Sequence, residues 1–337
     1  MRTIKLMSLL LLLLVVNKSY SQGIFSKRNV VNQYSSVGIG GGSSHYWGDL
    51  SPLKYFYLGA ITLPRWNGTV NYTRYLTPNF AARFAFSYIR ISGDDYKFST
   101  QWGVEKFAGQ FARNLHFRND IKEFVISGIY NLSNQYGKGP QNRVKLTPYV
   151  MVGIGFYGHN PMARGTITDG SGNLIAKASG EPDIKKYTAL APLKTSGQIK
   201  PYGAIQLVAP VALGLKYRLN DKWDVSAEAG LRITPFDYLD DVGNGNYPSA
   251  SASDPVFTNR SRENYEARTG ESRIPGFNQV APIFGLVSGS LQPLNNVVVG
   301  DTAPIRTRGT KAWDYYGTVQ VTLNYILSNK IKCPPIK

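Results

Sequence analysis

Apolar and polar residues alternate along several stretches of this chain, and the longest such stretch lies near the C-terminus. Between Trp313 and Leu327, every second residue is apolar, aromatic or glycine, and the residues between them are mostly Asp, Thr, Gln and Asn. A period of two predicts a β-strand with one apolar and one polar face. At about 15 residues this strand would be longer than those of soluble proteins, and it has the length of a tilted strand that crosses a membrane.

Seven other stretches show the same alternation, some of them more weakly, so that eight strands are predicted in all. These stretches cover residues 35–46, 66–76, 80–88, 123–132, 149–156, 211–219 and 223–234. Such two-faced strands are typical of a barrel wall that has lipid on one side and a polar interior on the other.

The links between the predicted strands alternate in length. Short links cover residues 77–79, 133–145 and 220–222, and long links cover about 47–65, 91–122, 158–206 and 235–312. Outer-membrane barrels combine short periplasmic turns with long outer loops. We therefore predict an all-β protein, an eight-stranded up-and-down antiparallel transmembrane β-barrel with long extracellular loops and with both termini in the periplasm.

The first 21 residues have the three parts of a secretory signal peptide. A basic start precedes an apolar run at residues 6–16, which is too short to span a bilayer, and a polar stretch with small residues ends at Ser21. We predict cleavage after Ser21, so that residues 22–337 form the barrel in the outer membrane; a buried N-terminal helix is the weaker alternative. Since no cysteine comes directly after the apolar run, a lipid-anchored lipoprotein is excluded.

The formal net charge of +17 would fit a nucleic-acid partner. Loss of Arg2, Lys5 and Lys18 with the signal peptide lowers that charge by 3, and an exported chain does not meet cytoplasmic nucleic acid. We therefore predict no nucleic-acid partner. The low charged fraction of 18%, with 34 Gly and 22 Tyr, fits strands that face lipid.

Aromatic residues fall at the ends of several predicted strands. They are Tyr46, Trp66, Tyr217, Trp223 and Trp313. Amphipathic rings are stable at the borders of a membrane, so we predict that these residues belong to two aromatic girdles.

Six charged residues fall on the polar faces of the predicted strands and would point into the barrel. They are Arg83, Lys216, Arg218, Asp224, Glu228 and Arg232. An eight-stranded barrel is just wide enough for side chains to fill it, and an unpaired buried charge is costly. We predict that these charges pair across the lumen and plug it; a path for anions is the alternative that the small circumference disfavours.

No motif of a catalytic or metal site is found, and we predict no enzymatic activity, no cofactor and no metal. His45, His116 and His159 each stand alone in sequence, without metal-ligand spacing such as HExxH, and are interpreted as surface or rim residues. Some eight-stranded outer-membrane barrels are lipid A-modifying enzymes with a His/Ser site near the rim, which keeps that activity as a minor alternative.

Two further stretches have both a binding and a structural interpretation. The glycine run at residues 38–42 resembles a phosphate-binding loop but lacks the Lys-Ser/Thr pair, so we interpret it as a strand that bends where the barrel curves. The carboxylates of Asp237, Asp240 and Asp241 could bind Ca²⁺, but the spacing of an EF-hand is absent. We favour a structural role in which these aspartates bond to loop backbone or to a nearby arginine.

The predicted loop at residues 235–312 is long enough to be either functional or disordered. Its basic residues and those of the second long loop could contact lipopolysaccharide phosphates, with solvated surface charge as the alternative. These residues include Lys97, Lys106, Arg113, Arg118, Arg260 and Arg262.

The single cysteine, Cys333, lies just past the last predicted strand, on the periplasmic side. An odd cysteine in an exported protein suggests a free thiol or an intermolecular bridge. We favour an unpaired thiol, with a tether to a periplasmic partner as the alternative.

Several short motifs are spread over nearly the whole mature chain. They are the run at residues 37–41, Tyr46-Trp47-Gly48-Asp49-Leu50, residues 190–195, Asp237-Tyr238-Leu239-Asp240-Asp241-Val242, Arg308-Gly309, Trp313-Asp314-Tyr315-Tyr316 and Cys333-Pro334. Together they resemble motifs of the Bacteroidota outer-membrane barrels related to PorG of the type IX secretion system. The chain departs from that pattern at Ser196, where an acidic residue is expected, and at Gly243, where Ser is usual.

The resemblance implies a non-enzymatic outer-membrane barrel that anchors periplasmic ring proteins, like PorK and PorN, of the secretion machinery used in gliding. It carries no catalytic residues over. It assigns a structural role to the motif residues Gly48, Asp49, Asp237, Tyr238, Leu239, Asp240 and Asp241. The alternative is a small porin or a surface barrel that binds ligands through residues 235–312.

Overall fold

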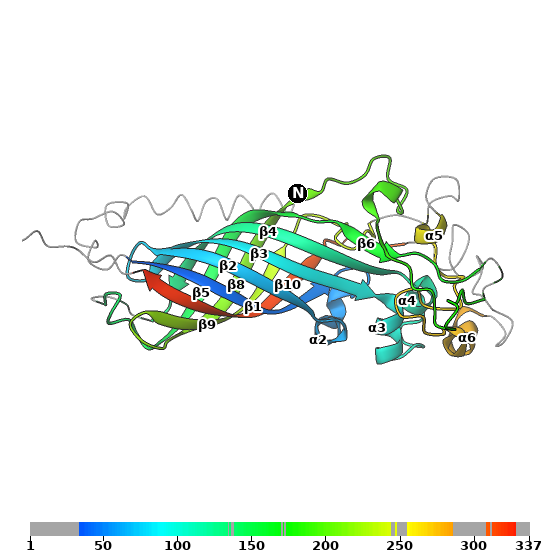
Figure 1. The fold of residues 1–337 in the computed structure, drawn as a ribbon, viewed down its shortest axis with the longest axis horizontal. Coiled ribbons are helices and arrows are strands. Elements are labelled where there is room, and N and C mark those ends of the chain that lie inside the picture. Colours follow the sequence, from blue (N-terminus) through cyan, green and yellow to red (C-terminus); the bar gives the residue numbers. More distant parts are fainter. Residues whose placement is uncertain are drawn as a thin grey trace, which may run out of the picture.

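In a computed structural model, the structure describes residues 34–133, 135, 138–169, 171, 173–243, 247, 255–285, 308–310 and 312–327. Within them, eight long antiparallel strands form a closed barrel (Figure 1). These strands are β1 (Ser35–Trp47), β2 (Arg65–Tyr75), β3 (Phe80–Asp94), β4 (His116–Asn131), β5 (Leu146–Gly158), β8 (Ile205–Arg218), β9 (Trp223–Ile233) and β10 (Tyr315–Leu327). The prediction of an eight-stranded antiparallel barrel is confirmed.

The barrel closes because its first and last strands pair with each other. Ser35 lies opposite Leu327 and Trp47 lies opposite Tyr315, so the β1–β10 ladder runs along the full length of both strands. The circular order is β1, β2, β3, β4, β5, β8, β9, β10, with each strand hydrogen-bonded to the next. Closure leaves no unpaired edge in the wall.

The glycine run lies inside β1 and faces β10 closely. A Cβ on Gly40 would approach the Val321 carbonyl oxygen to 2.7 Å and would overlap with the Thr322 side chain. The glycines therefore allow a tight approach within the wall, and the structure places them in a strand rather than in a phosphate-binding loop.

The four long links gather at one end of the barrel and contain short elements of their own (Figure 1). They hold η2 (Leu53–Tyr55), α2 (Phe56–Thr62), α3 (Asp95–Trp102), α4 (Ala108–Arg113), β6 (Pro161–Arg164), β7 (Tyr187–Ala189), η3 (Ala191–Leu193), α5 (Pro255–Thr258), α6 (Ile274–Val280) and η4 (Ala281–Phe284). We call the described residues of these links the cap. None of the described helices is long and apolar enough to cross a membrane.

The cap has a small hydrophobic core that joins separate links. Phe111 of α4 packs edge-on against Phe277 of α6 with ring centroids 5.8 Å apart, and Tyr96, Val280 and Ala281 belong to the same buried cluster. The described part of the 235–312 link is therefore folded against the 91–122 link. Strands β3 and β4 extend beyond the predicted ends into this region, because their pairing continues as far as Asp94 and His116.

Candidate functional site

The wall of the barrel is apolar outside and polar inside. On β8, Leu213 is 67% exposed while its neighbour Ala212 is buried, and on β5 Ile154 is 66% exposed while Met151 is buried. The exposed large side chains of the wall are mostly Leu, Ile, Val and Phe, whereas the buried ones on β9 and β10 are mostly polar or charged. This inverted distribution is that of a transmembrane barrel in lipid.

Four of the five predicted girdle residues lie on the outer surface. Trp66, Tyr217, Trp223 and Trp313 are all exposed. The prediction is wrong for Tyr46, which is buried and turned into the barrel. The alternation of β1 is the reason, since Val37 and Ile39 face outward and the even-numbered residues therefore face inward.

Three contacts cross the lumen between diametrically opposite strands. Arg83 of β3 pairs with Glu228 of β9, with Nη1 and Oε2 2.7 Å apart. Lys216 of β8 donates to the Tyr75 hydroxyl of β2 at 2.9 Å. The Tyr316 hydroxyl of β10 donates to Glu123 of β4 at 2.6 Å.

Further hydrogen bonds tie these contacts to the rest of the lumen. Glu228 also accepts from the Tyr149 hydroxyl at 2.9 Å and from Gln320 at 3.2 Å, and Arg232 lies 3.5 Å from Glu123. The space left among these side chains measures about 20 Å³, room for about one water molecule.

Two predicted lumen charges, Asp224 and Arg218, lie at the end with the short links. Asp224 pairs with Arg143 at 2.8 Å, and both side chains are buried. Arg218 departs from the prediction, because it is half-exposed and donates to the Gln141 carbonyl at 3.1 Å rather than to a carboxylate across the lumen. Arg143 belongs to a link rather than a strand, so no periodicity marked it as a lumen residue.

At the cap end, residues from several of the motifs meet in one buried polar group, which we call the rim cluster. Its members are Tyr46, Gly48, Asp49, Arg113, Asp240, Asp241, Arg308 and Asp314. In sequence, most of these residues are connected only by the motifs that resemble PorG-related barrels; in the structure they lie together.

The Tyr46 hydroxyl lies between two carboxylates of the rim cluster. It is 2.6 Å from Asp240 Oδ2 and 3.1 Å from Asp314 Oδ1. One hydroxyl hydrogen cannot serve both oxygens, so the second contact requires a proton on one carboxyl. Gly48 lies against the same group, where a Cβ would overlap with Tyr46 and Asp314.

Burial raises the pKa of Asp240 and of Asp314 well above the ordinary carboxyl value. The nearby Asp49 raises the pKa of Asp240 further, and Asp240 and Asp49 both raise that of Asp314. Burial also raises the pKa of Asp49. A proton on Asp240 or Asp314 is therefore favoured by electrostatics as well as by the hydrogen bonds of Tyr46.

Asp241 bonds to a nearby arginine, as predicted. Arg308 donates to its backbone carbonyl at 2.6 Å and lies 3.6 Å from its carboxylate, which also accepts from Thr195 and from Tyr202. The other predicted partner, loop backbone, is seen at Asp240, which accepts from the Val242 amide at 2.8 Å. Tyr238 stacks on Tyr202, and the Leu239 amide donates to Asp314.

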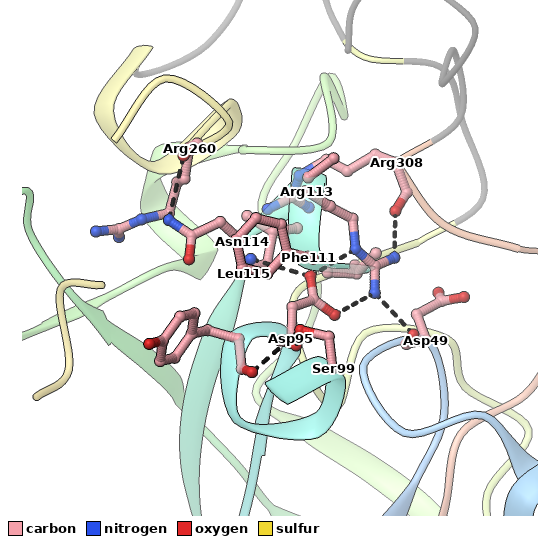
Figure 2. Close-up of polar contacts among 12 residues, drawn as sticks. Asp49, Asp95, Ser99, Phe111, Arg113, Asn114, Leu115, Arg260 and Arg308 are labelled. Carbon is pink, nitrogen blue, oxygen red and sulfur yellow. Dashed lines mark hydrogen bonds and ion pairs between the residues drawn. The ribbon is translucent and has the colours of Figure 1, made fainter. Parts of the chain in front are cut away.

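Arg113 joins three links at the centre of the rim cluster (Figure 2). Its guanidinium binds the Asp95 carboxylate at 2.7 and 2.8 Å and donates to the carbonyls of Asp49 and Arg308, each at 2.8 Å. Neither Arg113 nor Arg260 is available to lipopolysaccharide, because both are buried in such contacts. Lys97, Lys106 and Arg262 remain exposed.

A pocket of about 620 Å³ opens beside the rim cluster. Leu53, Trp313 and Tyr315 line it, together with Asp49. Asp49 is 8% exposed; its Oδ1 accepts from the amide and hydroxyl of Thr310, and its Oδ2 has no hydrogen-bond partner among the residues that the structure describes. This pocket could take a small polar ligand.

The described residues contain no group of three His, Cys, Asp or Glu side chains that could hold a metal ion. His45 lies on the outer face of β1, and His116 and His159 lie at the rim, where β4 begins and just after β5 ends; because both are buried, the surface alternative is wrong for these two. Burial lowers the pKa of His159 to about 4, which keeps its ring neutral at physiological pH. The predicted signal peptide and Cys333 lie outside the described residues.

A family model described as a domain of unknown function (DUF6089) matches residues 13–170, which is less than half of the chain. No curated protein matches the sequence. Similar solved structures include Ail of Yersinia pestis in complex with the heparin analogue sucrose octasulfate (8% identity, 88% of this chain and 99% of that chain, TM-score 0.33). Others are Neisserial surface protein A (7%, 86% and 96%, 0.35) and OprG from Pseudomonas aeruginosa (8%, 89% and 97%, 0.29). At these identities and TM-scores the similarities carry no argument about function.

Proposed function

We propose that this protein is a non-enzymatic barrel of the outer membrane that serves as a structural anchor rather than as a channel. One observation carries this proposal, namely that the apolar wall surrounds a lumen filled by its own side chains. The Arg83–Glu228, Lys216–Tyr75 and Tyr316–Glu123 contacts bridge opposite strands at different heights. A solute would have to break these contacts in order to pass.

The signal peptide and the apolar wall support the outer membrane as the location, with the short links and both termini in the periplasm and the cap outside the cell. Bilayer lipid would then surround the wall, and lipopolysaccharide phosphates would lie within reach of the exposed Lys97, Lys106 and Arg262 of the cap.

The specific anchoring role that we propose rests on the resemblance to PorG-related barrels of Bacteroidota. In this role the barrel holds periplasmic ring proteins, like PorK and PorN, at the outer membrane for type IX secretion. The rim cluster supports it, because the motif residues that carry the resemblance form one buried structural unit rather than a catalytic arrangement.

The deciding experiment is deletion of the gene from the producing bacterium. We expect secretion of cargo with the C-terminal type IX signal to stop and to return with the full-length gene. Crosslinking through Cys333, with Cys333→Ser as the control, should capture a ring protein. Normal secretion in the deletion strain would refute the anchoring role.

A second candidate, a surface barrel that binds a small ligand, is favoured by the pocket of about 620 Å³ beside Asp49. Trp313→Ala removes one wall of this pocket without touching the lumen. Under the anchoring role this variant secretes normally; loss of a surface-binding phenotype with intact secretion would favour the ligand-binding role. Steady conductance of the purified protein in planar bilayers would favour a porin, and altered lipid A in the deletion strain would favour the lipid-modifying enzyme.

A further inference from the structure

The segment formed by η2 and α2 exposes large apolar side chains outside the barrel. Tyr57 is 83% exposed and Ile61 is 60% exposed, and Leu53 and Phe56 are exposed as well. Residues 55–64 contain no charged side chain, while Lys54 and Arg65 flank them. An uncharged exposed surface of this kind needs a partner that is not water.

The barrel wall holds this segment against its side. Trp47 of β1 stacks on Phe56 with ring centroids 4.4 Å apart, and its indole nitrogen donates to the Phe56 carbonyl at 2.9 Å. Gly317 of β10 makes room for Trp47, since a Cβ there would lie 2.8 Å from the indole ring. Figure 1 shows α2 beside the wall near the cap end of the barrel.

The strand register gives the height of α2 along the wall. His45, on the outer face of β1, bonds to the Ala60 carbonyl of α2 at 2.6 Å and pairs across the sheet with Gly317. Two residues along β1, Ser43 lies opposite Trp66, one of the exposed aromatic residues. Helix α2 therefore lies close to the level of Trp66.

The apolar surface of the segment is continuous with that of the wall. A groove of about 310 Å³ between them is lined by Phe56 and by Leu213, Leu231 and Val319 of the wall. Lipid in contact with the wall would extend into this groove and reach the exposed face of α2.

We infer that the η2–α2 segment lies in the interface of the outer leaflet, where it is a lateral membrane anchor whose partner is the lipid bilayer. Tyrosine is favoured at that depth, and Lys54 and Arg65 can extend to the headgroups from either end. The segment also gives a hydrogen-bond partner, the Ala60 carbonyl, to His45 on the lipid-facing side of β1, and His45 in turn bonds to Ser43. If the partner were a second copy of the chain, α2 would not need to lie at the level of the exposed aromatic residues of the wall.

The inference rests on the proposed membrane location and is tested by spin labels in the full chain. Tyr57→Cys and Ile61→Cys, each in a Cys333→Ser background, are labelled and reconstituted in vesicles of phosphatidylcholine and phosphatidylglycerol. Leu213→Cys is the control for a lipid-facing position, and Ser179→Cys, in an exposed turn of the cap, is the control for an aqueous one. Power saturation compares accessibility to oxygen with accessibility to a water-soluble nickel chelate.

We expect the oxygen-to-chelate ratio at 57 and 61 to be several-fold higher than at 179 and to approach that at 213. Ratios equal to that at 179, with 213 still facing lipid, would overturn the inference and leave the membrane location intact. Water-like ratios at 213 would overturn both. Dipolar broadening at 57 or 61 that disappears when the protein is diluted in lipid would identify a second copy as the partner and would also overturn the inference.

Discussion

Buried arginines occur in both the lumen and the cap, but they have different partners. In the lumen, Arg83 binds a carboxylate of the opposite strand. In the cap, Arg273 donates to the carbonyls of Glu263 and Phe111, and Arg308 donates to those of Asp241 and Thr258.

The difference follows from where the backbone finds its hydrogen bonds. The barrel ladder satisfies the carbonyls of the wall, so a charged side chain inside it must pair with another side chain. The irregular links of the cap leave carbonyls without ladder partners, and a guanidinium with five donors can satisfy several of them at once. Arg83 thus joins side chains across the lumen, whereas Arg113 and Arg273 also bind backbone carbonyls and so hold separate links of the cap together.

The largest expected effect is on the cap, at Arg113. Arg113→Ala leaves the buried Asp95 carboxylate with the Leu115 amide but without its ion-pair partner, and it removes the donor of two link carbonyls. We expect the cap to lose about 3–5 kcal/mol of stability. Limited proteolysis should cut the cap links, while heat-dependent gel mobility should show an intact barrel. Arg262→Ala, at an exposed arginine, is the matched control. Equal protease resistance of Arg113→Ala and Arg262→Ala would contradict the view that a buried arginine holds the links of the cap together.

In the lumen, Arg83→Met should cost about 2–3 kcal/mol, less than the loss in the cap, because Glu228 keeps its bonds from Tyr149 and Gln320. Urea unfolding in micelles measures the effect. Adding Glu228→Gln should recover much of the loss, since no buried charge then remains unpaired. If the Arg83→Met/Glu228→Gln variant were as unstable as Arg83→Met alone, the unpaired charge of Glu228 would not be the cause of the lost stability.

A smaller loss of stability is expected at Gly48, where the backbone lies against side chains of the rim cluster. Gly48→Ala forces a Cβ against Tyr46 and Asp314 and should cost about 1–3 kcal/mol. Gly109→Ala, in α4 with nothing near its Cβ, should instead stabilise the helix by about 0.5–1 kcal/mol. Thermal unfolding of the two variants should therefore shift in opposite directions, and a shift of the same sign in both would count against the packing argument.

The smallest effect concerns pH. Because burial raises the pKa of Asp240, the folded cap holds a proton that the unfolded chain releases near pH 4. Stability should consequently fall as the pH rises from about 4 toward the raised pKa. Asp240→Asn should flatten this slope between pH 5 and pH 8, followed as the melting temperature, and Asp183→Asn, at an exposed carboxyl outside the rim cluster, should retain it. An unchanged slope in Asp240→Asn would contradict the raised pKa of Asp240.

The sequence predicted the wall well because each wall residue responds to its own surroundings. Leu213 faces outward and Glu228 faces inward, and the alternation along each strand records that choice residue by residue. The same rule applied to β1 would have turned Tyr46 inward, and applied to β4 it would have placed Glu123 in the lumen.

The rim cluster had no such local signal. Tyr46 and Asp314 are 268 residues apart, and Arg113 reaches a carbonyl 195 residues away. Resemblance grouped several of these motifs, but it could not show that Arg113 is buried rather than free for lipopolysaccharide. The sequence alone thus determined the barrel, its strand number and which side of its wall meets lipid, since period-two patterning is local. Only the tertiary structure decided which charges pair across the lumen and how four links close into a cap, because those contacts depend on the folded positions of distant residues.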